Sequence, residues 1–246
     1  MQILTSKLNN LLDFLFPKTC LFCGAFGEYV CANCREEKIE ILSQQYCHVC
    51  KKPIKDFGVH EECKEKTSLD GVKVICKYNK FIERIISEVK YNYYFKTADF
   101  LGELLLQAKN SIENNSIDVI VPIPIHRKRL WKRGFNQSEL LANFVGKQLN
   151  IPVILLIKRV RNTKTQVGLN RAERLKNLSN AFEINLKKVY IYNKSNEAVI
   201  SLGEFQNGNA LLIDDVMTTG TTLEECSKVL KYNGMKKVFG LVVARG

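Results

Sequence analysis

Two cysteine-rich quartets near the N-terminus constrain this chain more than any other feature. Residues 20–34 read CLFCGAFGEYVCANC, and residues 47–63 read CHVCKKPIKDFGVHEEC. Each stretch holds two ligand pairs of C-x-x-C spacing, with a histidine in place of one cysteine in the second. A pair with this spacing directs two side chains at one tetrahedral metal ion. The predicted zinc ligands are Cys20, Cys23, Cys31, Cys34, Cys47, Cys50, His60 and Cys63.

Four protein ligands per quartet leave no open coordination position, which indicates structural and not catalytic zinc. Sequential pairing, with one ion per quartet, is the simplest arrangement, and interleaved pairing or a single ion remains open at this stage. His48 lies within one C-x-x-C pair and is a weaker candidate. Nine cysteines in a chain expected to be cytosolic argue against disulfides. We interpret the isolated Cys76 and Cys226 as small core residues.

From residue 69 onward the pattern changes to alternating strands and helices. Apolar runs predict strands at 72–78, 117–124, 153–157, 210–213 and 238–244, and helical spacing predicts helices at 81–90, 98–109, 136–149 and 223–234. This alternation predicts an α/β fold with a parallel sheet and helices on both faces, and ligands bind such sheets beyond the carboxyl ends of the strands. We therefore expect a zinc-binding segment at 1–68 and an α/β domain at 69–246. Residues 187–209 are interpreted as a hairpin with no assigned function.

An acidic pair and a threonine-rich turn follow the strand predicted at 210–213. Gly220 permits a tight turn, and the following helix directs its positive N-terminal end at the same place, which favours a phosphate group. Asp214 and Asp215 suit the hydroxyls of a ribose and a nearby magnesium ion. A simple helix N-cap would explain one threonine but not the acids. The predicted donors to the phosphate are Thr218, Thr219, Thr221 and Thr222, together with Gly220.

Two basic segments precede this site in the sequence, in a chain of net charge +12 that attracts polyanions. In residues 121–137 the candidates for binding pyrophosphate, or a single nucleic-acid strand stacked on an aromatic ring, are Arg127, Arg129, Trp131 and Arg133. In residues 158–177 the candidates for neutralising charge on the pyrophosphate are Arg159, Lys164 and Arg174. The alternatives are a solvated basic face for the first segment and a basic surface linker for the second.

The stretch at 210–222 resembles the phosphoribosyl pyrophosphate signature of type I phosphoribosyltransferases. With the zinc quartets and the RGFNQ stretch at 133–137, the chain resembles the ComF family, which is associated with DNA uptake in bacterial competence. The resemblance implies a type I phosphoribosyltransferase-like fold for residues 69–246. It implies that Asp214 and Asp215 hold ribose hydroxyls and that Thr218–Thr222 hold the 5′-phosphate. It also implies that 158–177 is a mobile catalytic loop, whose Arg159, Lys164 and Arg174 neutralise the leaving pyrophosphate.

Three functions follow as expectations. The first is binding of phosphoribosyl pyrophosphate with magnesium in DNA uptake, with phosphoribosyl transfer to an unknown acceptor left open. The second is a non-catalytic module that binds single-stranded DNA through the phosphate site and the basic segments. The third is a zinc-dependent interaction scaffold with a relic domain. Other DNA-uptake proteins are further expected partners.

No stretch reaches the roughly 20 apolar residues that span a bilayer. Residues 1–16 have helical apolar spacing but lack a basic start and a cleavage site, so we interpret them as a helix packed on the protein and not as a signal peptide. The alternative is a membrane-surface helix, which a polar face poor in Lys and Arg disfavours. The expected location is the cytoplasm, with the inner face of the membrane left open.

Overall fold

A computed structural model describes residues 18–91, 95–161, 180–185, 189–190, 199–200 and 205–246. The helix expected at 1–16 lies outside these residues, as does most of the basic segment at 158–177. In the described part of the chain, no helix has both the length and the apolar character needed to span a membrane.

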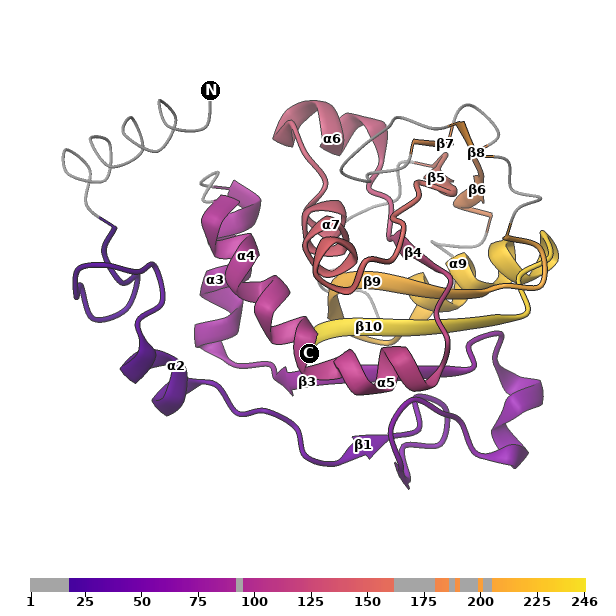
Figure 1. The fold of residues 1–246 in the computed structure, drawn as a ribbon, viewed down its shortest axis with the longest axis horizontal. Helices are drawn as coiled ribbons and strands as arrows, with labels where there is room; N and C mark the ends of the chain where they lie inside the picture. Colours follow the sequence, from indigo (N-terminus) through magenta and orange to yellow (C-terminus); the bar gives the residue numbers. More distant parts are fainter. Residues whose placement is uncertain (1–17, 92–94, 162–179, 186–188, 191–198, 201–204) are drawn as a thin grey trace.

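The centre of the protein is a four-stranded parallel sheet (Figure 1). Its strands, in spatial order, are β3 (Gly71–Lys77), β10 (Lys237–Arg245), β9 (Asn209–Met217) and β4 (Val119–Pro122). The main helices are α3 (Lys80–Tyr91), α4 (Phe95–Leu105), α5 (Lys109–Asn114), α7 (Gln137–Leu149) and α9 (Thr221–Tyr232), with a 3-10 turn, η2 (Leu106–Ala108), before α5. The expected α/β architecture is confirmed.

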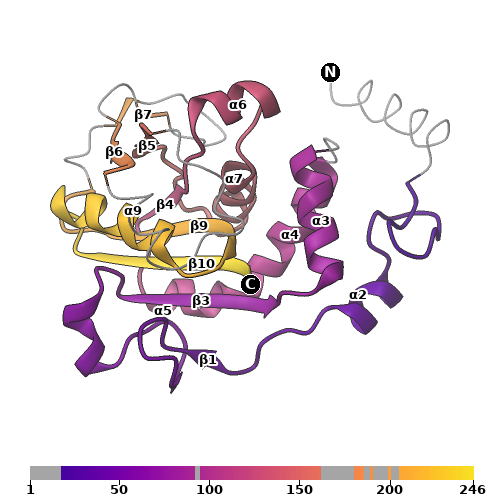
Figure 2. The same ribbon diagram turned by 180° about the vertical axis from the view of Figure 1, so that it is seen from behind.

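Side-chain alternation along β9 sends successive residues into two separate cores. Leu211 and Ile213 pack in the core formed with α3, α4 and α7. Ala210 and Leu212 pack in the core formed with α9, which lies in front of the sheet in Figure 2. All four residues are fully buried. Both faces of this strand are therefore covered, which explains why it reads in sequence as a continuous apolar run.

The strand predicted at 153–157 is wrong. Val153 makes only an isolated parallel bridge to Ile120. The amide of Leu156 donates to the carbonyl of Ile154 at 2.9 Å, a tight turn that ends the pairing. The run is apolar because its residues fill the cores, and its pairing with the sheet is limited to two backbone hydrogen bonds that join Pro152 and Ile154 to Ile120 of β4. Beyond this turn, β5 (Ile157–Arg159) pairs antiparallel with β6 (Phe182–Ile184).

The hairpin predicted at 187–209 is confirmed where it is described. There β7 (Val189–Tyr190) pairs antiparallel with β8 (Val199–Ile200).

The cysteine-rich segment contains short elements: α2 (Ala32–Lys38), β1 (Gln45–Tyr46), β2 (Pro53–Ile54) and the 3-10 helix η1 (Glu61–Lys66). Between them the chain runs along the outer edge of β3. Ile41 bridges Cys76, and the side-chain amide of the buried Gln45 bonds the N–H and the carbonyl of Val74 at 3.0 and 2.9 Å. The segment thereby satisfies an edge strand that would otherwise expose its polar groups. The domain boundary at residue 68 stays a prediction.

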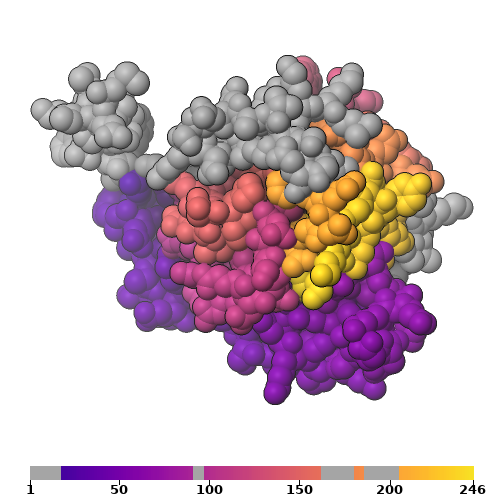
Figure 3. Space-filling model, turned by 45° about the vertical axis from the view of Figure 1, so that its right-hand side comes forward, coloured from indigo at the N-terminus to yellow at the C-terminus, as the bar shows by residue number. Residues whose placement is uncertain are grey.

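Figure 3 shows this packing on the surface, where the violet second half of the segment adjoins the yellow C-terminal part of the chain.

Candidate functional site

The eight predicted zinc ligands form two clusters, each with ligand atoms within 4.8 Å of one another. The first unites Cys20, Cys23, Cys31 and Cys34, and the second unites Cys47, Cys50, His60 and Cys63. Sulfurs of Cys23 and Cys31 lie 3.5 Å apart, and Nδ1 of His60 lies 3.2 Å from the sulfur of Cys50. Tetrahedral zinc with Zn–S bonds of about 2.3 Å holds its ligands about 3.8 Å apart, so both clusters fit the ion. The ligands are grouped sequentially, as predicted.

His48 is not part of the second cluster. Its Nε2 lies 2.8 Å from the hydroxyl of Thr67. Burial lowers the pKa of His48 to about 4. The neutral ring is therefore held outside the metal site.

The acidic pair lies at the carboxyl end of β9, next to the start of α7. Asn136 caps α7 by accepting from the amide of Ser138 at 3.2 Å, and its side chain also donates to the carbonyl of Ile123, just beyond β4, at 3.0 Å. This cap places Ser138 so that its hydroxyl donates to Oδ1 of Asp214 at 2.8 Å. The amide of Asp215 donates to the same oxygen at 2.9 Å. Among the described residues, Oδ2 of Asp214 accepts no hydrogen bond.

The two carboxylates have different environments. Asp214 is half-buried, whereas Asp215 is only 5% exposed. Oδ2 of Asp215 forms an ion pair with Lys90 of α3 and accepts from Gln137 of α7 at 3.5 Å. Gln137 in turn accepts from Arg133. Asp214 is thus the more accessible member of the pair, and Asp215 is anchored to two helices.

Electrostatics separate the pair further. Burial, followed by the charge of Asp215, raises the pKa of Asp214 to about 7. Burial opposes the charge on Lys90, but the carboxylate of Asp215 outweighs it and raises the pKa of that lysine. Lys90 therefore stays charged and neutralises Asp215, so the ion pair of Lys90 and Asp215 adds little net negative charge where an anion would bind.

The threonine turn, residues 218–222, connects β9 to α9. Gly220 has φ of +83°, a left-handed conformation that a side chain would strain. The hydroxyls of Thr219 and Thr221 lie 2.8 Å apart. Because α9 begins at Thr221, the N–H groups of its first turn, which have no carbonyl partner within the helix, lie at this turn, as the phosphate prediction requires.

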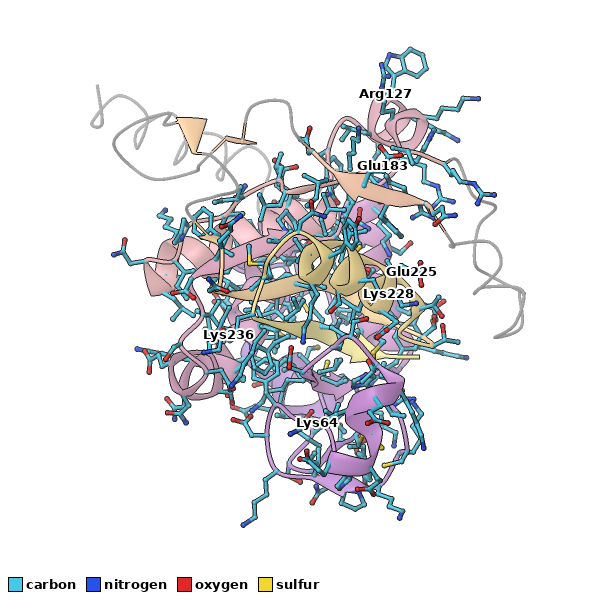
Figure 4. The ribbon with its side chains drawn as sticks, turned by 90° about the vertical axis from the view of Figure 1, so that its right-hand side faces the viewer. Lys64, Arg127, Glu183, Glu225, Lys228 and Lys236 are labelled. Carbon is cyan, nitrogen blue, oxygen red and sulfur yellow. The ribbon has the colours of Figure 1, made fainter. Side chains whose placement is uncertain are left out.

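The first basic segment forms α6 (Arg127–Arg133). Arg127 is exposed, and Figure 4 shows it at the opposite end of the molecule from Lys64 of η1. Trp131 is 91% exposed. Arg129 and Arg133 are half-buried, and Arg133 contacts the acidic pair through Gln137. The helix therefore has one side toward the acids and another toward solvent.

Arg159, expected within a mobile loop, instead ends β5 and is only 8% exposed. Its guanidinium lies 5.4 Å from the ring centre of Phe182. Burial, followed by the charge of Arg129, lowers its pKa, so the two basic segments lie close enough to interact. Lys164 and Arg174 lie outside the described residues.

Three site residues were missed in the sequence: Lys90, Gln137 and Ser138. Gln137 and Ser138 follow a predicted helix start, which is a usable signal. Lys90 sits in an amphipathic helix more than a hundred residues from the acids, and nothing in the sequence distinguishes it from a solvated lysine.

Solved structures with some similarity include a purine phosphoribosyltransferase from Pyrococcus horikoshii, with TM-score 0.35 and 15% identity over 60% of this chain and 83% of that one. TT1426 from Thermus thermophilus has TM-score 0.32 and 12% identity over 60% of this chain and 81% of that one. The parallel sheet of this protein is established by its own strand pairing.

Sequence comparisons are more decisive. The double zinc ribbon domain family model matches residues 11–65, which agrees with the two ligand clusters and with structural zinc. DNA utilization protein YhgH of Salmonella typhimurium is 31% identical over 172 residues, 67% of each chain. Competence protein ComFC of Bacillus subtilis is 25% identical over 214 residues, 84% of this chain and 80% of the relative. Competence protein F of Haemophilus influenzae is 30% identical over 233 residues, 87% of this chain and 95% of the relative. The chain belongs to the ComF family of competence proteins.

Proposed function

We propose that this protein binds phosphoribosyl pyrophosphate where β4 and β9 end. The observation that carries the proposal is the half-buried Asp214, whose Oδ2 is free to accept from a ribose hydroxyl, beside the start of α9. The threonine turn would bind the 5′-phosphate, because the first N–H groups of α9 have no partner within the helix.

Asp215 has a supporting role in this proposal. Its ion pair with Lys90 fixes the end of β9 against α3, and its contact with Gln137 fixes it against α7. A ribose would be gripped mainly by Asp214, with Asp215 holding the geometry. The resemblance implied a direct contact with ribose hydroxyls for both acids.

Magnesium suits the same place. It binds through one or two carboxylates together with substrate phosphates, and it would neutralise pyrophosphate. The carboxylate of Asp214 offers an oxygen for this ion. Arg129 of α6 and Arg159 of β5 lie close enough for their positive charges to repel each other. Both would face the pyrophosphate and stabilise its negative charge. Lys164 and Arg174 would also neutralise charge on the pyrophosphate.

The biological role proposed is handling of incoming DNA in the cytoplasm. Its support is the names of relatives, a competence protein in Haemophilus influenzae and a DNA utilization protein in Salmonella typhimurium. Phosphoribosyl transfer to an acceptor of unknown identity is the catalytic form of the proposal.

A second candidate function is binding of single-stranded DNA along α6. Trp131 is 91% exposed and lies among arginines and lysines, an arrangement suited to base stacking beside phosphates. Tyr232, 92% exposed at the end of α9, offers a matched aromatic control outside the basic helix.

Isothermal calorimetry with phosphoribosyl pyrophosphate and magnesium tests the first candidate. We expect Asp214→Asn to weaken binding at least tenfold, because a hydrogen bond to a charged group contributes about 1.5–3 kcal/mol. Wild-type protein that releases no heat and shows no competition with inorganic pyrophosphate would refute it.

A salt titration of single-stranded DNA binding tests the second candidate. Affinity should fall steeply with salt, and Trp131→Ala should weaken it while Tyr232→Ala should not. Equal effects of the two substitutions would contradict binding of single-stranded DNA along α6.

A further inference from the structure

A chain of hydrogen bonds joins the second zinc cluster to the start of α9. Nε2 of His48, next to the ligand Cys47, lies 2.8 Å from the hydroxyl of Thr67. That hydroxyl lies 2.6 Å from Oε2 of Glu224, and the amide and hydroxyl of Ser68 donate to Oε1 at 2.9 and 3.0 Å. Glu224 is in the first turn of α9, directly after the threonine turn. Both of its carboxylate oxygens are thus bonded to the residues that follow η1.

The direction of each bond in the chain is fixed by chemistry. An ionised carboxylate only accepts, so the single proton of the Thr67 hydroxyl points to Glu224. His48 must then donate from Nε2, which leaves Nδ1 as an acceptor. This agrees with the absence of a partner at Nδ1 among the described residues. A chain whose donors all point one way holds its members in one geometry.

A further contact strengthens this junction. The hydroxyl of Ser227, one turn further along α9 and fully buried, donates to the carbonyl of Ser68 at 2.9 Å. Residues 67 and 68 therefore contact α9 at two successive turns.

The first zinc cluster is attached elsewhere. Phe22 stacks on Phe81 of α3 at 3.6 Å between ring centres, and Arg35 of α2 pairs with Glu103 of α4 at 2.9 Å. Among the described residues, the hydrogen bonds that join the cysteine-rich segment to the first turn of α9 come from the side of the second cluster.

We propose that Glu224 is a positioning residue that couples metal binding at the second cluster to the geometry of the threonine turn. With the ion in place, the loop carrying His48 is fixed, Thr67 and Ser68 hold Glu224, and α9 begins where a phosphate can meet its N–H groups. The link to phosphate binding rests on the proposed function, whereas the link to the turn does not.

Hydrogen exchange of the amides at 218–222, measured on the full zinc-loaded protein, tests the coupling. Thr67→Val and Glu224→Gln should retain both metal ions and raise exchange in the turn roughly fivefold or more, within the usual range of coupling between sites. Thr67→Ser keeps the hydroxyl and should restore the wild-type rate.

Two controls are available. Glu225→Gln makes the same charge change in the same helical turn, but Glu225 pairs with Lys228 of the same helix at 2.7 Å (Figure 4). Arg35→Gln removes the exposed ion pair with Glu103 that attaches the first zinc cluster to α4. Both should exchange as wild type does.

Removal of the second metal by Cys63→Ser, or of both metals by a chelator if that variant does not fold, should raise exchange in the turn as Thr67→Val does. Wild-type exchange in both Thr67→Val and Glu224→Gln would overturn the proposal, as would an equal rise in Glu225→Gln.

The affinity for phosphoribosyl pyrophosphate gives a separate readout. It should fall about fivefold in Glu224→Gln relative to Glu225→Gln. Absence of binding to wild-type protein would refute the proposed function, and the exchange measurements would still decide the coupling.

Discussion

Replacing Lys90 by methionine should destabilise the protein although no zinc ligand or core side chain is lost. Lys90 forms an ion pair with Asp215, and the two side chains are 22% and 7% exposed. Methionine preserves most of the apolar stem but removes the charge. The carboxylate of Asp215 would remain buried beside Asp214 without a cation to neutralise it.

The size of the effect follows from burial. Removing one partner of a fully buried ion pair costs about 3–5 kcal/mol, because the other charge is left uncompensated. Water reaches part of the Lys90 site, so we expect about 2–3 kcal/mol. In a chain of this size each kcal/mol lowers the melting temperature by about 2–4 °C, which predicts a fall of roughly 4–12 °C.

Scanning calorimetry at pH 8 measures this change. Lys77→Met is the matched control, because its ion pair with Glu40 at 3.3 Å is exposed on both sides, at 62% and 63%, and such pairs contribute about 0–1 kcal/mol. Lys90→Met combined with Asp215→Asn should recover most of the loss, since no buried charge then lacks a partner. A melting temperature for Lys90→Met equal to that of Lys77→Met would refute the reasoning.

Three further predictions concern pH, packing and metal. Because the pKa of Asp214 is raised to about 7, the folded state loses stability as the pH rises from about 4 to 7. Asp214→Asn should therefore be more stable than wild type at pH 8 and should lose that advantage near pH 4. Urea denaturation at both pH values measures this, and an advantage independent of pH would contradict it. A Cβ at Gly71 would lie 2.3 Å from the backbone nitrogen of Gly58, so Gly71→Ala should destabilise the protein by about 1–3 kcal/mol. It should also make residues 47–63 more sensitive to limited proteolysis, and unchanged proteolysis would count against this packing. Cys34→Ser and Cys63→Ser should each lose one equivalent of zinc by elemental analysis, whereas loss of both ions from either variant would argue against independent sites.

Local spacing was sufficient to predict the metal ligands and the alternating strands and helices. A C-x-x-C pair converges on one point whatever surrounds it, so the eight ligands could be read from the sequence, whereas their sequential grouping into two sets came from the structure. The threonine turn was also local, because a strand, Gly220 and a helix start adjoin in the chain. The strand at 153–157 failed because an apolar run indicates burial and not pairing.

The sequence alone determined which groups could bind zinc, a sugar phosphate or a polyanion, since those properties belong to side chains and to short segments. Only the tertiary structure decided what each group has as its neighbour. Asp214 and Asp215 are adjacent in the chain, yet one stays accessible and the other is bound by Lys90 from a distant helix. The bond from Thr67 to Glu224 spans 157 positions, and no local pattern encodes it. Charge and hydrogen bonding act through space, so these contacts exist only once the chain is folded.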